Sequence, residues 1–414
     1  MKKTRVLVLL ILIGLILSSC SFLSDDIRLY VQEGISAENQ SDQEEMVTIS
    51  VEEYEHLKQF QVLDEMGFIV DSLFYQEADQ DAMITGMKRG FLSGVGDPYT
   101  FYYTAEEFEK MWEDDKGEYV GIGILISTSF ETMESTVSRV FRNTPAEKVG
   151  LQKKDVLIRV EDLEVTPYTI NDAVDLIRGE VGKEVEIEIR RGEENLVFTL
   201  TREDVVVNPE EYMMLTEDVG YIAFYNFTSG SHVAFTNAEE ELMKKGAKGL
   251  IIDLRDNPGG WLTDALAIAD EFIDGREIIA YMEDKNGSRE YHYSTEGAKK
   301  IPLVVLINEN SASASELLAG ALKDYQLATL VGVNTFGKGI VQSVLPVGTQ
   351  GEGMQLTVAQ YFTPLENPVH EVGIAPDIEI PLPEGDIGMY ELGDLADVQL
   401  AAGLKEIEAL IAKN

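Results

Sequence analysis

The spacing of apolar and polar residues changes twice along the chain, and each change marks a different kind of region. Over residues 50–94 the apolar positions are spaced as in helices. Ser50 and Glu53 have the spacing of a capping box at a helix start. The pattern therefore predicts helical structure over 50–75 and a second helix over 79–94, which ends at a glycine-rich turn.

After residue 116, apolar and polar residues alternate with a period of two. Residues 119–127 have the composition of a strand, and residues 185–189 and 196–200 alternate on either side of a short turn, which predicts a β-hairpin. A short helix is predicted over 169–178. These elements together predict a small β-rich module.

From residue 219 onward, short apolar runs alternate with helical patterns, which is typical of an α/β core with a buried, mostly parallel sheet. The predicted strands are 221–224, 249–253, 302–308 and 328–333, and the predicted helices are 238–245, 316–325 and 397–413.

The first twenty residues have the pattern of an export signal. Lys2, Lys3 and Arg5 precede an apolar run over 6–17, and Ser-Ser-Cys follows, with the cysteine at Cys20. This start resembles a bacterial lipoprotein signal, which implies that Cys20 is lipid-modified. The alternative is an uncleaved membrane anchor, because an uncharged helix over 6–24 would span about 28 Å. Both readings place the body outside the cytoplasm, anchored to the cell membrane.

Composition excludes several classes of protein. The 414 residues contain 33 basic and 74 acidic side chains, a formal net charge of -41, which would repel nucleic acid. Cys20 is the single cysteine, so neither an internal disulfide nor a metal site built on several thiolates can form. Only four histidines occur, at scattered positions, which argues against a zinc site. We therefore expect no metal and no cofactor.

Three segments carry candidate chemistry. A serine in the run Ser-Ala-Ser-Ala-Ser over 311–315 would lie beside free helix N–H groups, although the same residues could simply cap the helix. Lys338, between two glycines, could act as a base if burial keeps it neutral, although a solvated loop lysine is the ordinary reading. Gly259 and Gly260 could aim N–H groups at an oxyanion or form only a tight turn.

The order and spacing of these segments resemble the carboxy-terminal processing protease family, also called tail-specific proteases. The motifs are Asp-Leu-Arg-x-Asn-Pro-Gly-Gly, Ser-Ala-Ser-Ala-Ser-Glu and Thr-Phe-Gly-Lys-Gly-x-Val-Gln, within a similarity that covers about residues 50–382. The resemblance implies a Ser–Lys dyad in which the serine precedes the lysine by 25 positions, which selects Ser313 for Lys338. It also implies that Gln342 orients the lysine and that backbone N–H groups of Ala314 and of the pair Gly259 and Gly260 form the oxyanion hole; which glycine donates stays open.

The β-rich module resembles a PDZ domain. Its carboxylate-binding loop would be Gly121, Ile122, Gly123 and Ile124, where successive N–H groups hold a peptide's terminal carboxylate and the next strand accepts the peptide by β-addition. One position departs from the family pattern, because Lys154 stands where a glycine is usual.

The sequence thus predicts a multidomain α/β protein with a helical N-terminal region, an inserted PDZ-like β-rich domain and an α/β Ser–Lys protease core. The predicted boundaries are 1–19 signal peptide, 20–47 acidic flexible tether, 48–116 helical N-terminal region, 117–204 PDZ domain, 205–385 protease core and 386–414 C-terminal helical segment.

The predicted function is that of an exported, membrane-tethered serine endopeptidase that recognises the free C-terminal tails of proteins and cleaves near them. The rival hypothesis is a non-catalytic scaffold that binds protein tails through the PDZ domain and keeps the protease core as a relic. The resemblance also allows a homodimer.

Overall fold

The computed structural model describes residues 49–115, 118–129, 132–206, 208–383 and 390–413. They belong to two compact units, Met1–Lys88 and Arg89–Asn414, which are described separately below. The predicted signal segment, Cys20 and the predicted tether all lie outside the described residues. Within those residues, the helices are too short or too polar to cross a bilayer.

The described part of the first unit is helical. It contains α3 (Val51–Lys58), α4 (Gln61–Leu73) and the start of α5 (Gln80–Ser93), which continues into the second unit. The predicted capping box is confirmed, because the Ser50 N–H donates to the Glu53 carboxylate at 2.8 Å and the Glu53 N–H donates to Ser50 Oγ at 3.1 Å.

The second unit contains the β-rich module. Its elements are β2 (Glu118–Gly121), β3 (Ile124–Ser129), β4 (Glu134–Val140), α7 (Pro145–Val149), β5 (Val156–Val160), β6 (Leu163–Glu164), α8 (Ile170–Ile177), β7 (Glu184–Arg191), β8 (Glu194–Thr201) and β9 (Glu203–Val206). The sheet order is β3-β4-β5-β7-β8, with β6 on β5, so β3 is an edge strand. The predicted hairpin is confirmed as β7 and β8, and the predicted short helix as α8.

The strand predicted over 119–127 is divided into β2 and β3. Gly123 lies between them with φ +84°, and a Cβ at this position would overlap the side chain of Thr144. β2 pairs with β9, so the chain enters and leaves the module through two adjacent antiparallel strands. This arrangement lets a complete module be inserted into another domain.

The rest of the second unit forms the α/β core. Two of its elements precede the β-rich module, β1 (Phe101–Tyr103) and α6 (Ala105–Asp115). The elements after the module are β10 (Glu210–Met214), β11 (Val219–Phe224), α9 (Ser231–Lys244), β12 (Gly249–Asp253), α10 (Leu262–Asp270), β13 (Ile278–Asp284), β14 (Arg289–Tyr293), β15 (Leu303–Ile307), α11 (Ala314–Asp324), β16 (Ala328–Gly332), β17 (Ile340–Val347), β18 (Glu352–Phe362), β19 (Ile378–Glu379) and α12 (Val398–Lys413).

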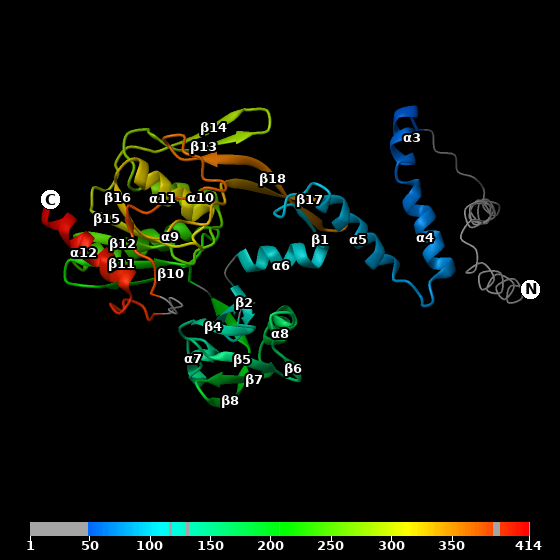
Figure 1. Cartoon of the computed structure of the whole chain (residues 1–414), viewed down its shortest axis with the longest axis horizontal. Coiled ribbons are helices and arrows are strands. Elements are labelled where there is room, and N and C mark those ends of the chain that lie inside the picture. Colours follow the sequence, from blue (N-terminus) through cyan, green and yellow to red (C-terminus); the bar gives the residue numbers. More distant parts are fainter. Residues whose placement is uncertain (1–48, 116–117, 130–131, 207, 384–389, 414) are drawn as a thin grey trace, which may run out of the picture. The chain divides into compact units, whose positions relative to one another are not determined.

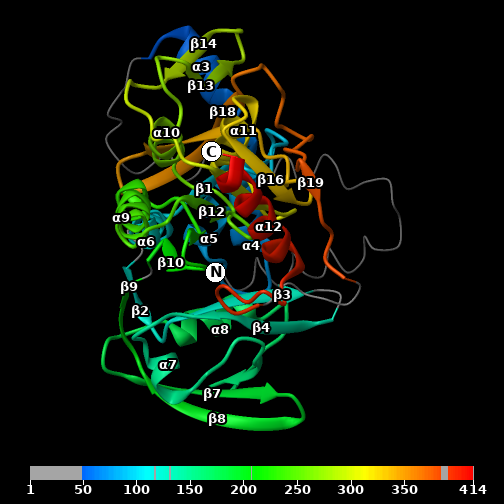
Figure 2. The same cartoon turned by 90° about the vertical axis from the view of Figure 1, so that its left-hand side faces the viewer.

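The main sheet of the core has the order β10-β11-β12-β15-β16-β19, and all of its strand pairs are parallel except β10 with β11. Alternate residues of its central strands face opposite sides. Leu250 and Ile252 pack in the cluster that includes α9, α10 and α11, whereas Ile251 packs with Leu400 and Ile407 of α12. Helices therefore cover both faces of the sheet, as its unbroken apolar strands predict (Figures 1 and 2).

A second, antiparallel sheet connects the segment before the PDZ-like module with the end of the core. Its order is β1-β18-β13-β14, and β17 also pairs with β18. Because β1 and β17 share one partner strand, residues near 100 and residues near 340 are brought into the same region. This sheet was not predicted from the spacing of apolar residues, since its strands are partly exposed and lie far apart in the sequence.

Helix α9 starts at Ser231, seven residues before the predicted start. Its first turns contain Ser, His, Val and Thr, which have only weak helix propensity. The ring of Phe235 is completely buried in the core, so tertiary packing stabilises this part of the helix.

Candidate active site

The three predicted chemical segments meet at one edge of the main sheet. The paired-glycine segment follows β12, the serine segment follows β15, and the lysine segment follows β16. These three strands are parallel and adjacent, so their carboxyl ends lie at the same edge. Crevices outside the carboxyl ends of parallel strands are the usual place for binding sites in α/β proteins.

Ser313 occupies the N-cap position of helix α11. Its backbone has φ 56° and ψ -114°, an unusual conformation for a residue other than glycine, and the residue is 8% exposed. The Ser313 N–H donates to a Glu316 carboxylate oxygen at 2.8 Å, and the Tyr361 hydroxyl donates to the Ser313 carbonyl at 2.8 Å. Both backbone polar groups of Ser313 are therefore hydrogen-bonded, which holds the strained turn at the start of the helix.

The carboxylate of Glu316 joins the serine segment to the lysine segment. Besides the Ser313 N–H, it accepts hydrogen bonds from the backbone N–H groups of Gly337 (2.7 Å) and Lys338 (2.9 Å) and from the Thr335 hydroxyl (2.5 Å). Glu316 is completely buried, and these four donors satisfy both of its oxygens. Glu316, the third residue of α11, thus caps the start of this helix and also holds the backbone of the lysine loop.

The paired glycines lie against the serine. A Cβ placed on Gly259, which has φ +99°, would lie 2.6 Å from the Ala312 carbonyl oxygen, 2.8 Å from Ser313 Cβ and 2.9 Å from the Ala314 nitrogen. Only a glycine leaves this space open. The Gly259 N–H already donates to Asn257 Oδ1 at 2.9 Å.

Asn257 connects this turn to the serine segment. It is completely buried, and its backbone carbonyl accepts the Ala312 N–H and the Ser315 hydroxyl, both at 3.0 Å. The hydroxyl of Ser311 donates to the Leu254 carbonyl at 2.7 Å. Ser311 and Ser315 therefore use their hydroxyls to hold the loop, whereas Ser313 is the serine whose Cβ lies against the glycine turn.

Lys338 is half-buried, and its ammonium lies 4.4 Å from the centre of the Tyr99 ring, a cation–π distance. Burial lowers the pKa of Lys338 below its usual value, while the negative charges of Asp97 and Glu316 oppose that effect. Within the described residues, no hydrogen bond joins Lys338 Nζ to Ser313 Oγ.

The pocket around Lys338 includes residues that the sequence did not suggest. Burial raises the pKa of Asp97, but hydrogen bonds from Thr100, Thr357 and the Tyr99 N–H outweigh it and lower that pKa overall. Asp97 and Tyr99 belong to the Gly-Asp-Pro-Tyr-Thr turn, which was assigned only to the helical N-terminal region. The pairing of β1 and β17 with β18, which no local pattern reveals, brings this turn to the lysine.

Gln342 lies on β17, four residues after Lys338. Its side-chain amide donates to the Thr357 hydroxyl at 3.3 Å, and Thr357 in turn hydrogen-bonds Asp97. No direct bond from Gln342 to Lys338 is present in the described part of the chain. Gln342 therefore contacts the pocket of the lysine through Thr357 and Asp97.

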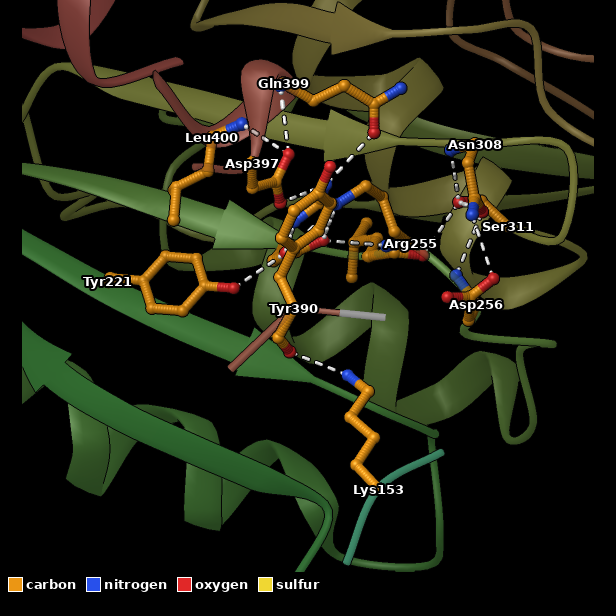
Figure 3. Close-up of polar contacts among 12 residues, drawn as sticks. Lys153, Tyr221, Arg255, Asp256, Asn308, Ser311, Tyr390, Asp397, Gln399 and Leu400 are labelled. Carbon is orange, nitrogen blue, oxygen red and sulfur yellow. Dashed lines mark hydrogen bonds and ion pairs between the residues drawn. The ribbon is translucent and has the colours of Figure 1, made fainter. Parts of the chain in front are cut away.

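A buried ion-pair network holds the start of the glycine segment (Figure 3). Arg255 pairs with Asp253 through two hydrogen bonds of 2.9 and 2.6 Å and contacts Asp397 at 2.6 Å and Gln399 at 3.0 Å. Asp397 and Gln399 lie at the start of α12, so this network ties the C-terminal helix to the loop that carries the glycines. In the same view, Lys153 of the β-rich module donates to the Tyr390 carbonyl at 2.6 Å.

The predicted carboxylate-binding loop lies at the start of the edge strand β3. Gly121 ends β2, Ile122 is completely buried, and Ile124 begins β3. Lys154 stands where a glycine is usual in the family. The turn there is kept, because Lys154 itself adopts a positive φ of +76°. Edge strands have unpaired backbone groups that can bind an extended peptide.

Asp324, at the end of α11, has a structural role. It accepts hydrogen bonds from the Leu365 N–H at 2.9 Å and the Asn367 side chain at 3.1 Å, and so stabilises the turn after β18.

As for metal sites, the described residues contain no group of three or more His, Cys, Asp or Glu side chains suited to hold an ion.

A serine at the start of a buried helix, next to paired glycines and tied to a half-buried lysine, is the arrangement of a serine peptidase, and the β-rich module beside it has the form of a PDZ domain. Comparison with known proteins agrees. Residues 218–380 match the model of peptidase family S41, and residues 136–191 match the PDZ domain model.

Two bacterial proteins illustrate the similarity. The carboxy-terminal processing protease CtpA of Bacillus subtilis is 34% identical over 318 residues, which cover 76% of this chain and 67% of that protein. The carboxyl-terminal-processing protease of Synechocystis is 35% identical over 322 residues, 76% of this chain and 74% of that protein. The chain therefore belongs to the S41 carboxy-terminal processing proteases, as the resemblance of its motifs predicted.

The solved structures support the same fold. The photosystem II D1 C-terminal processing protease is 27% identical, with a TM-score of 0.55, and the match covers 86% of this chain and 98% of that one. The prediction of a helix-and-sheet protease core with a PDZ domain is confirmed.

Proposed function

We propose that this C-terminal processing protease cleaves with a Ser–Lys dyad. Ser313 Oγ attacks the carbonyl carbon of the scissile bond while Lys338 Nζ, neutral at that moment, takes the hydroxyl proton. The C–N bond then breaks, and Lys338 returns the proton to the leaving amine. Water hydrolyses the acyl-enzyme, again with Lys338 as base. The observation that supports this most is the Glu316 carboxylate, which holds the backbone of both residues.

For the oxyanion hole we propose the N–H groups of Ala314 and Gly260. The Gly259 N–H is occupied by Asn257, which favours the second glycine of the pair. Ala314 is the first residue of α11, so its N–H belongs to the positive, N-terminal end of the helix. This helix is buried over nearly its whole length. Gly259 provides the space in front of these donors.

Lys338 must leave the Tyr99 ring before it can accept the proton of Ser313. We propose that substrate binding at the PDZ domain promotes this change. The domain contacts the core through Arg139, which pairs with Glu211 at 2.7 Å and stacks on Tyr225 at 3.4 Å, and through Lys153. Deletion of residues 118–203 should then change the rate of cleavage and the preference for particular tails; unchanged values of both would refute a role for the PDZ domain in gating.

Recognition of a free C-terminus is proposed for the loop from Gly121 to Ile124 and the edge strand β3. The unpaired edge of β3 supports binding by β-addition. A substrate with an amidated C-terminus should be cleaved more slowly than the same substrate with a free carboxylate. Equal rates would contradict tail recognition.

From the pattern of the first twenty residues, we also propose that the protein is exported and attached to the membrane. If Cys20 is the lipid attachment point, Cys20→Ser should release the protein from the membrane fraction or leave an unprocessed precursor. A variant that stays membrane-bound, with the same N-terminus as the unchanged protein, would favour the uncleaved anchor. We also propose a homodimer, as the resemblance to the family allows; sedimentation of the purified chain would test it, and a monomer at all concentrations would contradict it.

The decisive experiment compares the full chain with Ser313→Ala on an unfolded protein that ends in small apolar residues. We expect cleavage by the unchanged chain and none by the variant. Equal cleavage by both would refute the dyad. No cleavage by either, with binding of the tail retained, would favour the scaffold hypothesis.

A further inference from the structure

The chain has two tryptophans, and they stack on each other beside the glycine pair. Trp112 lies on α6 and Trp261 directly follows Gly260. Their ring centroids are 6.2 Å apart with an angle of 27° between the planes. Trp112 is 37% exposed and Trp261 38% exposed, so each large ring leaves more than a third of its surface to solvent.

The Trp112 ring packs against another aromatic ring of its helix, and the backbone of Trp261 is hydrogen-bonded to the core. On α6, the Phe108 ring lies edge-on to Trp112 at 6.0 Å and occupies the space that the missing side chain of Gly353 leaves on β18. Trp261 is held through its backbone, since its N–H donates to the Phe227 carbonyl at 2.7 Å. A rigid, partly exposed aromatic surface costs little entropy when a ligand covers it.

The position of Trp261 relates this surface to the scissile bond. Trp261 and Gly260 are neighbours in the chain, so their Cα atoms lie about 3.8 Å apart. The N–H of Gly260 is the one we assign to the oxyanion hole. An extended substrate advances about 3.3 Å per residue. A side chain within two positions of the scissile bond can therefore reach the tryptophan rings.

The surroundings of the rings select the chemistry of that side chain. Aromatic and large aliphatic groups gain most from contact with indole faces. Glu109, one turn before Trp112 on α6, is exposed, and the whole chain has a net charge of -41, so an acidic side chain would be repelled.

We propose that Trp112 and Trp261 form a subsite that selects a large apolar side chain within two positions of the scissile bond and rejects acidic ones. This inference rests on the proposed function, because it takes the oxyanion hole as its reference point. The competing explanation is that the stack only attaches α6 to the core and never contacts substrate.

The first test measures binding without cleavage. Because all tryptophan fluorescence of the chain comes from these two rings, Ser313→Ala can be titrated with short unstructured peptides that share one C-terminal sequence and carry Phe, Ala or Asp at a single internal position near the expected cleavage site. We expect the Phe peptide to change the emission and to bind about 10-fold more tightly than the Ala peptide, with the Asp peptide weakest. Equal emission changes and affinities for all three peptides would overturn the proposal.

The second test measures selectivity in the active protein, as the ratio of kcat/KM for the Phe substrate to that for the Ala substrate. Trp261→Ala should reduce this ratio to near one, because the Phe substrate loses more than the Ala substrate, and Trp261→Phe should retain most of the ratio. Trp112→Leu provides an independent variant with the same expectation. Tyr293→Ala, which removes an exposed ring of β14, is the matched control and should leave the ratio unchanged.

The outcomes separate the subsite from the catalytic assignment. If the tryptophan variants lower kcat/KM for both substrates equally, or leave the ratio as it was, the stack is only structural and the subsite is refuted. If instead Ser313→Ala cleaves as fast as the unchanged chain, the proposed dyad fails, whatever the ratios are.

Discussion

The serine side and the lysine side of the active site are held in different ways. On the serine side, Ser313 is almost completely buried, both of its backbone polar groups are hydrogen-bonded, and the residues from Ala314 to Leu322 are all buried. On the lysine side, the backbone of Lys338 is equally well held by Glu316, but the four-carbon side chain is half-buried and ends over an aromatic ring.

This difference indicates where the protease can be controlled. The backbone of Ser313, the proposed nucleophile, is fixed by packing and hydrogen bonds and cannot move without disturbing the core. The lysine head can move by rotation of its side chain alone, which needs no change of fold. The position and protonation of Lys338, set by Tyr99 and Asp97, are therefore the adjustable part of the site.

Replacement of the lysine tests the comparison with the largest expected effect. Lys338→Met keeps the length of the side chain but removes the base, and kcat/KM should fall by at least about 10³-fold while circular dichroism stays the same. Lys285→Met, in an exposed loop, is the control and should have normal activity. A loss below tenfold would mean that another group is the base.

Glu316→Gln tests whether one carboxylate holds both sides. The amide group would face two of the four donors that now bind Glu316, and each unpaired buried donor costs roughly 1–3 kcal/mol. We expect the free energy of unfolding of the core to fall by about 2–6 kcal/mol, together with a loss of activity. Denaturant unfolding of this variant and of the exposed control Glu309→Gln measures it; equal stability of the two would contradict the role of the carboxylate.

Asp97→Asn tests the electrostatics of the lysine side. The charge of Asp97 stabilises protonated Lys338, so its removal should lower the pKa of the lysine further. With Lys338 as the proposed base, activity requires the neutral amine and rises with pH as Lys338 loses its proton. The rising limb of the kcat/KM profile should therefore move to lower pH in this variant, and a shift to higher pH would show that Asp97 acts in another way.

Ser315→Ala should have the smallest effect. The change removes a hydroxyl that donates to the Asn257 carbonyl, a bond worth about 1 kcal/mol, without touching the reacting atoms. We expect activity within about threefold of the unchanged chain, given that loss of one such bond perturbs the loop only slightly. A loss as complete as that expected for Ser313→Ala would place the nucleophile at Ser315.

Local patterns predicted much of the fold because, in the elements concerned, neighbouring residues alone carry the spacing typical of a strand, a hairpin or a helix start. The hairpin of β7 and β8, the buried strands β12 and β15 and the capping box of α3 were all recognisable from consecutive residues. The early start of α9 was missed, since its stability comes from the burial of Phe235 and not from propensity. The alternation of apolar residues did not show the glycine break between β2 and β3, because only the closeness of Thr144 requires it, whereas the resemblance to a PDZ domain placed a loop there.

The sequence by itself determined the family, since three short motifs in a constant order specify it, and with the family came the predicted pair Ser313 and Lys338. Only the tertiary structure decided what surrounds that pair. Tyr99 reaches Lys338, and Trp112 reaches Trp261, because strand pairing and helix packing bring together residues that are far apart in the chain. Such contacts follow from the whole fold and leave no trace in the spacing of neighbouring residues.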